Sequence, residues 1–287
     1  MSRPRRSRLR GSRLRDLGRH AVLIGVSLFF VIPFYMVLVN GFKPKQLIVR
    51  SPLAPPSPET FTLANFSKAL GNPTFDLFYA YAFSALLAGM VVVLVITFGA
   101  GLSYWIGRRN DRRSRWIYVG LLAGLMVPPQ VVVIPVVKLL DAMGLLFTLP
   151  GLVVYDVAYY LPFTAFVYVG FVRTLPRELD EAAAVDGAGL IATFWRVIFP
   201  LMKPATASLA VLLTVFVWND FINPQILLGG SGGYTVTTGI YRAVGIYSSD
   251  FGQVFAYIQL AGAPMLALFF LAQRYIVGGL TGGAVKG

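Results

Sequence analysis

Cysteine is absent from this 287-residue chain, and histidine occurs once, as His20. These absences exclude a disulfide framework, a cysteine nucleophile and a metal centre built from cysteine and histidine. Charged residues are also scarce, at 13% of the chain against about 25% in a typical soluble domain. No pair of carboxylates and no Ser/His pair visibly converges, so the sequence does not predict an enzyme.

Apolar residues make up 56% of the chain and gather in six blocks. Each block is long enough to cross a bilayer, which takes about 20 residues in a helix. The blocks are Ala21–Phe42, Phe75–Gly107, Ile117–Val137, Leu152–Val172, Ala205–Leu228 and Val254–Gln273. We therefore expect an all-α membrane protein with six transmembrane helices. Pro128, Pro129 and Pro135 predict a kink in the third helix, because proline removes backbone donors.

Lys and Arg are unevenly distributed among the segments that join these blocks. With the N-terminus in the cytoplasm, the cytoplasmic segments hold 19 of the 25 Lys and Arg residues, in agreement with the positive-inside rule. We therefore expect both termini to be cytoplasmic, with 1–20 a basic tail, 21–276 the transmembrane domain and 277–287 a glycine-rich tail. Topology and contact with membrane lipid explain the net charge of +13, and nucleic acid is not an expected partner.

The segments expected outside the cytoplasm are rich in turn-forming residues. Six prolines between Lys43 and Thr74 exclude long regular structure there, apart from a short helix near Leu63–Leu70. The glycine-rich segment 229–233 is followed by Tyr234, whereas a phosphate-binding loop needs a Lys-Ser/Thr pair. If the protein uses ATP, another subunit must bind it.

The largest cytoplasmic segment is 173–203. Arg177–Val185 reads as a short helix and residues 186–189 as a turn. A second short helix is expected over Leu190–Ile198, ending before Pro200. This pair of helices could dock on another protein or lie on the membrane surface, and both interpretations remain open on these residues alone. The residues that would allow close approach or large apolar contacts are Ala182, Ala183, Ala184, Phe194, Trp195 and Phe199.

The segment Glu181–Pro200 resembles the EAA loop of ABC importer permeases, whose pattern is EAA-x3-G-x9-I-x-LP. The matching residues are Glu181, Ala182, Ala183, Gly187 and Pro200. Val197 replaces Ile and Phe199 replaces Leu, and both changes keep an apolar residue. Further segments resemble the carbohydrate-uptake, maltose-permease-like branch of the family, among them Met126–Gln130, Leu175–Leu179, Val217–Phe221 and the chain's end from Gln273.

The resemblance implies a non-catalytic permease subunit of a binding-protein-dependent ABC importer in the inner or plasma membrane of a prokaryotic cell. It implies three kinds of partner: a companion permease subunit, two ABC ATPase subunits that bind Mg-ATP, and an extracytoplasmic solute-binding protein. It implies no cofactor or metal in this chain. The residues it assigns to ATPase coupling are Glu181, Ala182, Ala183, Asp186, Gly187, Val197, Phe199 and Pro200. In maltose-type relatives, the C-terminal tail reaches into the ATPase dimer interface.

Polar residues within the apolar blocks are the candidates for contact with the solute, because ionisable groups in a bilayer usually face a polar cavity or a partner. They are Gln130, Asp156, Tyr159, Trp218, Asn219, Asp220 and Asn223. Packing between helices is an equally good interpretation of the same residues. The expected solute is a sugar. The alternatives are a non-sugar solute such as glycerol phosphate, and a self-sufficient channel or secondary transporter, against which the EAA loop counts.

Overall fold

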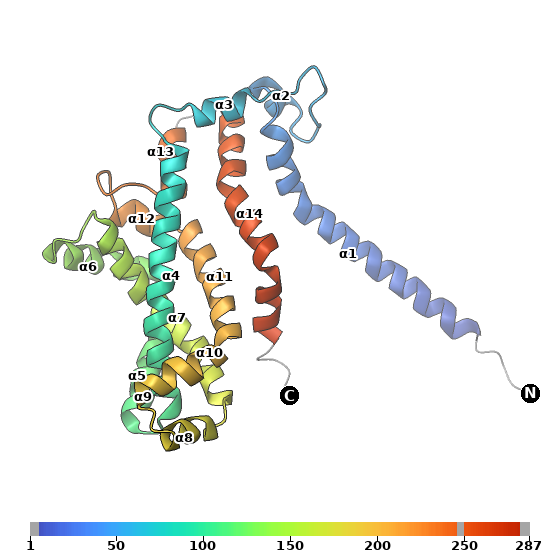
Figure 1. Cartoon of the computed structure of the whole chain (residues 1–287). Helices are drawn as coiled ribbons and strands as arrows, with labels where there is room; N and C mark the ends of the chain where they lie inside the picture. The colour runs from blue at the N-terminus through green and yellow to red at the C-terminus, as the bar shows by residue number, and fades with distance from the viewer. Residues whose placement is uncertain (1–5, 246–249, 282–287) are drawn as a thin grey trace, which may run out of the picture. The chain divides into compact units, whose positions relative to one another are not determined.

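The structure is a computed structural model that describes residues 6–245 and 250–281 (Figure 1). Its regular elements are helices, and no strand occurs among the residues described, which confirms the all-α class. The chain divides into two compact units. One unit comprises residues 1–73 and 244–262, and the other comprises residues 74–243 and 263–287.

The first unit contains the N-terminal helix and two short helices. Its elements are α1 (Arg6–Asn40), α2 (Lys45–Arg50), α3 (Ala64–Leu70) and the first part of α14 (Phe251–Thr281). The short helix expected near Leu63–Leu70 is confirmed as α3, whereas α2 was not expected. Between Gly18 and Asn40, α1 leaves most of its apolar side chains exposed, as a helix surrounded by lipid does. Residues 282–287, within the expected C-terminal tail, lie outside the described residues.

A buried lysine holds the proline-rich loop that follows α1. The ammonium group of Lys43 donates hydrogen bonds to the carbonyl oxygens of Ser51, Pro52 and Ala54, at 2.9, 3.4 and 2.8 Å. Burial lowers the pKa of Lys43, and the three carbonyl oxygens replace hydrogen bonds that the ammonium loses from water. Asn65 of α3 adds two hydrogen bonds to the backbone just after α1. Side-chain bonds to the backbone therefore order this loop.

Three long helices form the core of the second unit (Figure 1). They are α4 (Leu77–Arg108), α7 (Leu149–Thr174) and α11 (Lys203–Asn219). Helices α4 and α7 approach each other closely at two glycines of α4. A Cβ on Gly99 would lie 2.6 Å from Thr164 Cγ2, and one on Gly107 would lie 2.8 Å from Val172 Cγ1. Small residues allow such close approach between membrane helices, so α4 and α7 form a tight pair.

Two aspartates cap the starts of helices in this unit. Asp76 accepts hydrogen bonds from the backbone N–H groups of Phe78 and Tyr79 at the start of α4. Asp111 accepts one from the N–H of Ser114, at 2.8 Å, at the start of α5 (Arg112–Leu125). The hydrogen bond from Ser114 lowers the pKa of Asp111. Both carboxylates satisfy N–H groups that have no partner within the helix.

The third expected span is interrupted. Helices α5 and α6 (Pro129–Ala142) meet at an angle of 107°. Proline explains the interruption, because the residue before a proline avoids the helical region and a proline at the start of a helix needs no donor. The single kinked helix expected over Ile117–Val137 is therefore corrected to two helices. Pro135 lies inside α6.

The fifth expected span, Ala205–Leu228, is also interrupted. Helix α11 ends at Asn219, and after Asp220 and Phe221 the short helix α12 (Ile222–Leu227) begins. Helix α13 (Val236–Val244) follows the glycine-rich segment. One expected helix is thus corrected to two, with Asp220 at the junction.

The described residues contain four helices that are long and apolar enough to cross a membrane. They are Gly18–Asn40, Leu77–Arg108, Leu149–Thr174 and Phe251–Gln273. Two bent pairs also pass this test, one formed by α5 and α6 and the other by Leu190–Leu201 and Lys203–Asn219, which are bent by 76°. The fold therefore supplies between four and six spans.

Candidate functional site

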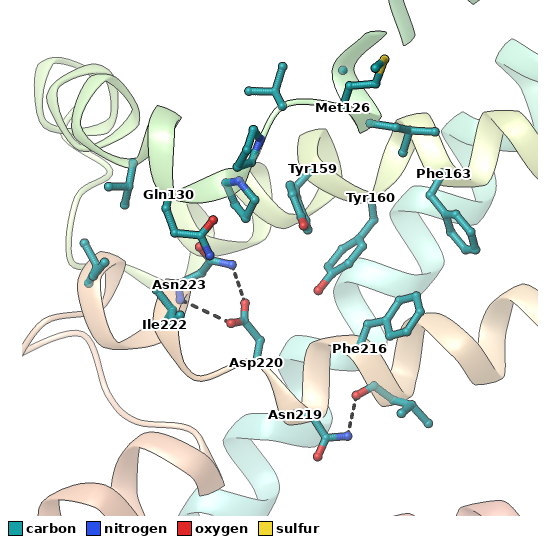
Figure 2. Close-up of a pocket in the computed structure, with 18 residues that line it drawn as sticks. Met126, Gln130, Tyr159, Tyr160, Phe163, Phe216, Asn219, Asp220, Ile222 and Asn223 are labelled. Atoms are coloured by element: carbon teal, nitrogen blue, oxygen red, sulfur yellow. Dashed lines mark hydrogen bonds between the residues drawn. The ribbon is translucent and has the colours of Figure 1, made fainter. Parts of the chain in front are cut away.

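A pocket of about 820 Å³ lies at the two helix interruptions of the second unit (Figure 2). The α5–α6 junction, α7 and the α11–α12 junction form its walls. Its lining residues are Gly124–Gln130, Val133, Tyr159, Tyr160, Phe163, Val215, Phe216, Asn219, Asp220, Ile222, Asn223 and Ile226. The volume falls within the range of about 300–1,000 Å³ that is typical of small-molecule sites.

Polar side chains gather on the wall formed by the α11–α12 junction. The carboxylate of Asp220 accepts hydrogen bonds from the side-chain amide of Asn223 at 2.7 Å and from its backbone N–H at 3.3 Å. This arrangement caps the start of α12 and fixes both side chains. Asn219 donates its amide to the carbonyl oxygen of Val215 at 2.8 Å. The junction therefore supplies a carboxylate and two amide groups to one side of the pocket.

Aromatic side chains from α7 and α11 form an adjacent wall. The rings of Tyr159 and Tyr160 meet edge to face, with centroids 4.9 Å apart, and Tyr160 stacks on Phe216 at 6.2 Å. Phe163 contacts the same Phe216 ring. Figure 2 shows Tyr159, Tyr160 and Asp220 around a common space. The pocket thus offers aromatic rings beside hydrogen-bonding groups, which suits a ligand that has both apolar faces and hydroxyls.

Five of the seven residues expected to contact the solute line this pocket. They are Gln130, Tyr159, Asn219, Asp220 and Asn223. Asp156 and Trp218 lie outside its lining. Asp156 is 1% exposed, and its Oδ1 has no hydrogen-bond partner among the described residues. Trp218 is buried and stacks on Tyr81. These two side chains belong to the interior of the unit.

The sequence did not indicate the aromatic lining residues Tyr160, Phe163 and Phe216. Inside a long apolar block, an aromatic residue carries no signal that separates a pocket wall from a surface that faces lipid. The packing of α7 and α11 around the two junctions places these three rings in the pocket, and that packing depends on residues distant in the sequence.

The segment that matches the EAA pattern folds into a short helix, a turn and an irregular second helix. Its elements are α8 (Glu178–Val185), α9 (Leu190–Thr193), the π-helical turn η1 (Phe194–Ile198) and α10 (Phe199–Leu201). The first expected helix is confirmed. The second does not end before Pro200, because the π-helical turn changes the hydrogen-bonding register and Pro200 lies in the first turn of α10, where no donor is needed.

Gly187 ends α8 in a conformation that favours glycine. Its φ is +82°, in the left-handed region. Its N–H donates to Ala184, and the N–H of Ala188 donates to Ala183, at 3.0 and 2.9 Å. These two hydrogen bonds form the Schellman motif, which satisfies carbonyl groups left over at a helix C-terminus. Gly187 therefore fixes the direction in which the chain leaves α8.

The EAA segment exposes some of the expected docking residues and buries others. Glu181, Ala182, Asp186 and Gly187 are exposed, and Val197, Phe199 and Pro200 are partly buried. Two residues expected on the docking face are buried within the chain. Ala183 is only 7% exposed, because α8 packs on η1, and Phe194 is 6% exposed because its ring packs on Tyr104. The large exposed apolar side chains at this end also include Val185, Leu190 and Ile191, which the motif did not indicate.

Residues 99–281 match the family of binding-protein-dependent transport system inner membrane components. The chain is 32% identical over 262 residues to the melibiose/raffinose/stachyose import permease protein MelC of Bacillus subtilis (strain 168), covering 89% of this chain and 91% of MelC. It is 30% identical to the trehalose/maltose transport system permease protein MalG of Thermococcus litoralis, covering 94% and 98% of the two chains.

A solved structure shares the fold. It is a chain of a bacterial ABC transporter involved in the import of the acidic polysaccharide alginate. The TM-score is 0.73 at 19% sequence identity, and the match covers 96% of this chain and 99% of the other. The family match covers more than half of this chain and includes the whole EAA segment. The chain therefore belongs to the inner membrane components of binding-protein-dependent transport systems and is a multi-pass permease subunit of an ABC importer.

Proposed function

We propose that this permease imports an uncharged saccharide. The relatives MelC and MalG carry the names of neutral oligosaccharides, melibiose, raffinose and stachyose in one case and trehalose and maltose in the other. The observation that carries the proposal is the pocket, in which the rings of Tyr159 and Tyr160 adjoin the carboxylate and amides of the α11–α12 junction. Rings can cover the apolar face of a sugar, while the polar groups bind its hydroxyls.

The charge of the pocket favours a neutral solute over glycerol phosphate. Asp220 supplies a carboxylate, and none of the lining residues, all of which the structure describes, is Lys, Arg or His. An anionic solute would face a like charge without a compensating cation, and such repulsion is strong away from bulk water. A sugar hydroxyl can instead donate to Asp220 and accept from the amide of Gln130.

The proposed topology has six spans and places both termini in the cytoplasm. The bent pair α5–α6 then counts as one crossing, and α11 together with α12 forms the fifth. This topology puts 173–203 and the basic residues 1–20 in the cytoplasm, in agreement with the distribution of Lys and Arg. It puts the loop ordered by Lys43 and the glycine-rich segment 229–233 on the outer side, where a solute-binding protein would dock.

The EAA segment is the proposed docking site for a partner ATPase. Glu181 and Asp186 are exposed carboxylates beside the exposed apolar side chain of Val185, and Glu181 can form a charge-assisted contact with a basic residue of the partner. Two ATPase subunits would bind Mg-ATP, and a companion permease would complete the translocation pathway. The C-terminal tail, 277–287, is proposed to contact the ATPase pair.

Reconstitution tests this function. The chain would be placed in liposomes with its companion permease, ATPase pair and binding protein, and uptake of labelled raffinose, maltose and glycerol phosphate would be measured. We expect uptake of a neutral sugar that requires both Mg-ATP and the binding protein, and no uptake of glycerol phosphate. Vesicles with a non-hydrolysable ATP analogue are the control. Transport by the chain alone would contradict the subunit role, and uptake limited to glycerol phosphate would contradict the sugar.

A further inference from the structure

Three side chains connect the end of α4 to the beginning of α8. The hydroxyl of Tyr104 donates a hydrogen bond to Asp180 Oδ1 at 2.5 Å, and Arg108 Nη2 forms an ion pair with Asp180 Oδ2 at 2.8 Å. The side chains of Arg108 and Asp180 are 13% and 23% exposed, so water competes little for them. Removing one partner of such a pair leaves the other charge without compensation. The ion pair between Arg108 and Asp180 therefore differs from exposed ion pairs, which contribute little to the stability of a protein.

The same guanidinium binds the end of α7. Arg108 Nη1 donates to the carbonyl oxygens of Val172 and Leu175 at 3.3 and 2.8 Å, and Nη2 donates to that of Pro176 at 3.2 Å. These carbonyl groups lie at and just after the C-terminus of α7, where helix carbonyls lack partners and a cation is favoured. Arg108 thus joins the ends of α4 and α7 to the first turn of α8.

The ring of Tyr104 adds a contact to the second half of the EAA segment. It is buried and packs on Phe194 of η1, with ring centroids 5.3 Å apart. Tyr104 therefore contacts α8 through its hydroxyl and η1 through its ring. Gly107 lies about one helical turn after Tyr104 on α4, and it is one of the two glycines at which α4 approaches α7 closely. Tyr104 and Arg108 therefore connect both halves of the EAA segment to the closely packed pair of helices α4 and α7.

Helix α7 connects this cluster to the pocket. Tyr159 and Tyr160, which form the aromatic wall, lie on α7, and the C-terminal carbonyls of α7 accept the hydrogen bonds from Arg108. A displacement of α8 therefore acts on α4 and α7 together, because the three helix ends share one guanidinium. A packed helix pair transmits such a displacement as a rigid body, since interiors at this density do not deform continuously.

We propose that Asp180, held by Tyr104 and Arg108, is the positioning residue that transmits movement of α8 to the α4–α7 pair and so to the aromatic wall of the pocket. The proposal rests on the proposed docking of α8 onto an ATPase. Neighbouring carboxylates then have separate roles. Glu181 is exposed for contact with the partner, whereas Asp180 is turned into the chain.

The ratio of solute taken up to ATP hydrolysed tests this role. Arg108→Met and Asp180→Asn would be assayed in the complete reconstituted complex. We expect each to lower the ratio at least about fivefold, the lower end of usual coupling between sites. The double variant should be no worse than the worse single variant, because the pair acts as a unit. Exposed neighbours provide matched controls, Arg109→Met and Glu178→Gln, which should leave the ratio unchanged.

A merely structural role would lower uptake and hydrolysis together in proportion to the amount of assembled complex. An unchanged ratio in assembled Arg108→Met and Asp180→Asn complexes would overturn the proposal. Absence of solute-dependent hydrolysis in the wild-type complex would instead contradict the proposed function. Tyr104→Phe removes only one hydroxyl and serves as a mild variant if the others do not assemble, with a smaller fall in the same ratio expected.

A cross-link supplies an independent measurement. Because the chain contains no cysteine, Tyr104→Cys and Asp180→Cys can be joined by a short bifunctional thiol reagent once cysteines in the partner subunits have been replaced. We expect the double cysteine variant to be poorly coupled and to recover uptake per ATP when the reagent joins α4 to α8. A ratio that stays low, or falls further, after cross-linking would show that the two helices need not move together, and would overturn the proposal.

Discussion

Asn223 donates its side-chain amide to the carboxylate of Asp220 at 2.7 Å, across the junction between α11 and α12. The same carboxylate accepts a hydrogen bond from the backbone N–H of Asn223 at 3.3 Å, which caps the start of α12, and the two bonds fix the carboxylate on the wall of the pocket. Asp220 and Asn223 therefore stabilise the start of α12 and are also candidate contacts for the solute. Substitutions at Asp220 should report on both.

Replacing Asp220 with asparagine removes the charge and keeps the shape. A hydrogen bond to a charged group contributes about 1.5–3 kcal/mol, so we expect the KM for sugar uptake to rise about tenfold or more. The measurement is the concentration dependence of uptake in proteoliposomes. Asp141→Asn, at an exposed position on α6 outside the pocket lining, is the control. Equal KM values for wild type and Asp220→Asn would exclude a contact between Asp220 and the solute.

Gly187→Ala tests the backbone at the end of α8. Nothing lies within 4 Å of a Cβ at this position, but φ is +82°, so the expected cost is backbone strain of about 1–2 kcal/mol. We expect a lower Tm of the purified complex and weaker ATPase binding. Gly189→Ala is a close match, because its surroundings are equally open and its φ is −73°. If both variants lose the same stability, the left-handed conformation of Gly187 is not the cause.

Gly107→Ala should disturb the α4–α7 pair. The added methyl group would lie 2.8 Å from Val172 Cγ1, and overpacking of this kind costs about 1–3 kcal/mol. Thermal unfolding in detergent should show a lower Tm, and the second substitution Val172→Ala should restore part of the loss by making room. Gly101→Ala, on the same helix in open surroundings, should have little effect. No rescue by Val172→Ala would argue against close packing at this level.

Lys43→Met should loosen the proline-rich loop of the first unit. It removes the hydrogen bonds to Ser51, Pro52 and Ala54. We expect local opening to become easier by about 2 kcal/mol, measured as faster amide hydrogen exchange over residues 47–62. Lys45→Met, at an exposed position two residues away, should leave exchange nearly unchanged. Equal exchange in the two variants would mean that the lysine does not order the loop.

Hydropathy and proline placement were sufficient to predict the long helices and α3, because continuous apolar runs and turn signals act over short distances. The same patterns did not predict the junctions at Pro128 and Asp220 as full interruptions. Apolar composition continues through both junctions, and an interrupted helix is tolerated there only because tertiary contacts satisfy the freed backbone groups. Those contacts, such as the hydrogen bond from Thr237 to the carbonyl of Asp220, come from distant parts of the chain.

The EAA pattern predicts a docking segment but not which of its side chains face outward. Ala183 and Phe194 are turned inward because α8 packs on η1 and Phe194 packs on Tyr104, and Tyr104 is distant in sequence. Five polar pocket residues were identified because polarity is conspicuous in an apolar block. Asp156 is just as conspicuous, yet it is buried outside the pocket, so polarity alone could not distinguish the two placements.

The polar residues that could determine solute specificity lie at the α5–α6 and α11–α12 junctions, apart from the contacts that hold α4 against α7. The pocket draws its carboxylate and amide groups from the two junctions and the helix ends beside them, whereas α4 and α7 meet along continuous helices. Residues at these junctions can be exchanged without disturbing the contacts of Gly99 and Gly107. A permease of this design can therefore be retuned to a different solute by a few replacements at two sites, while the machinery that drives it stays the same.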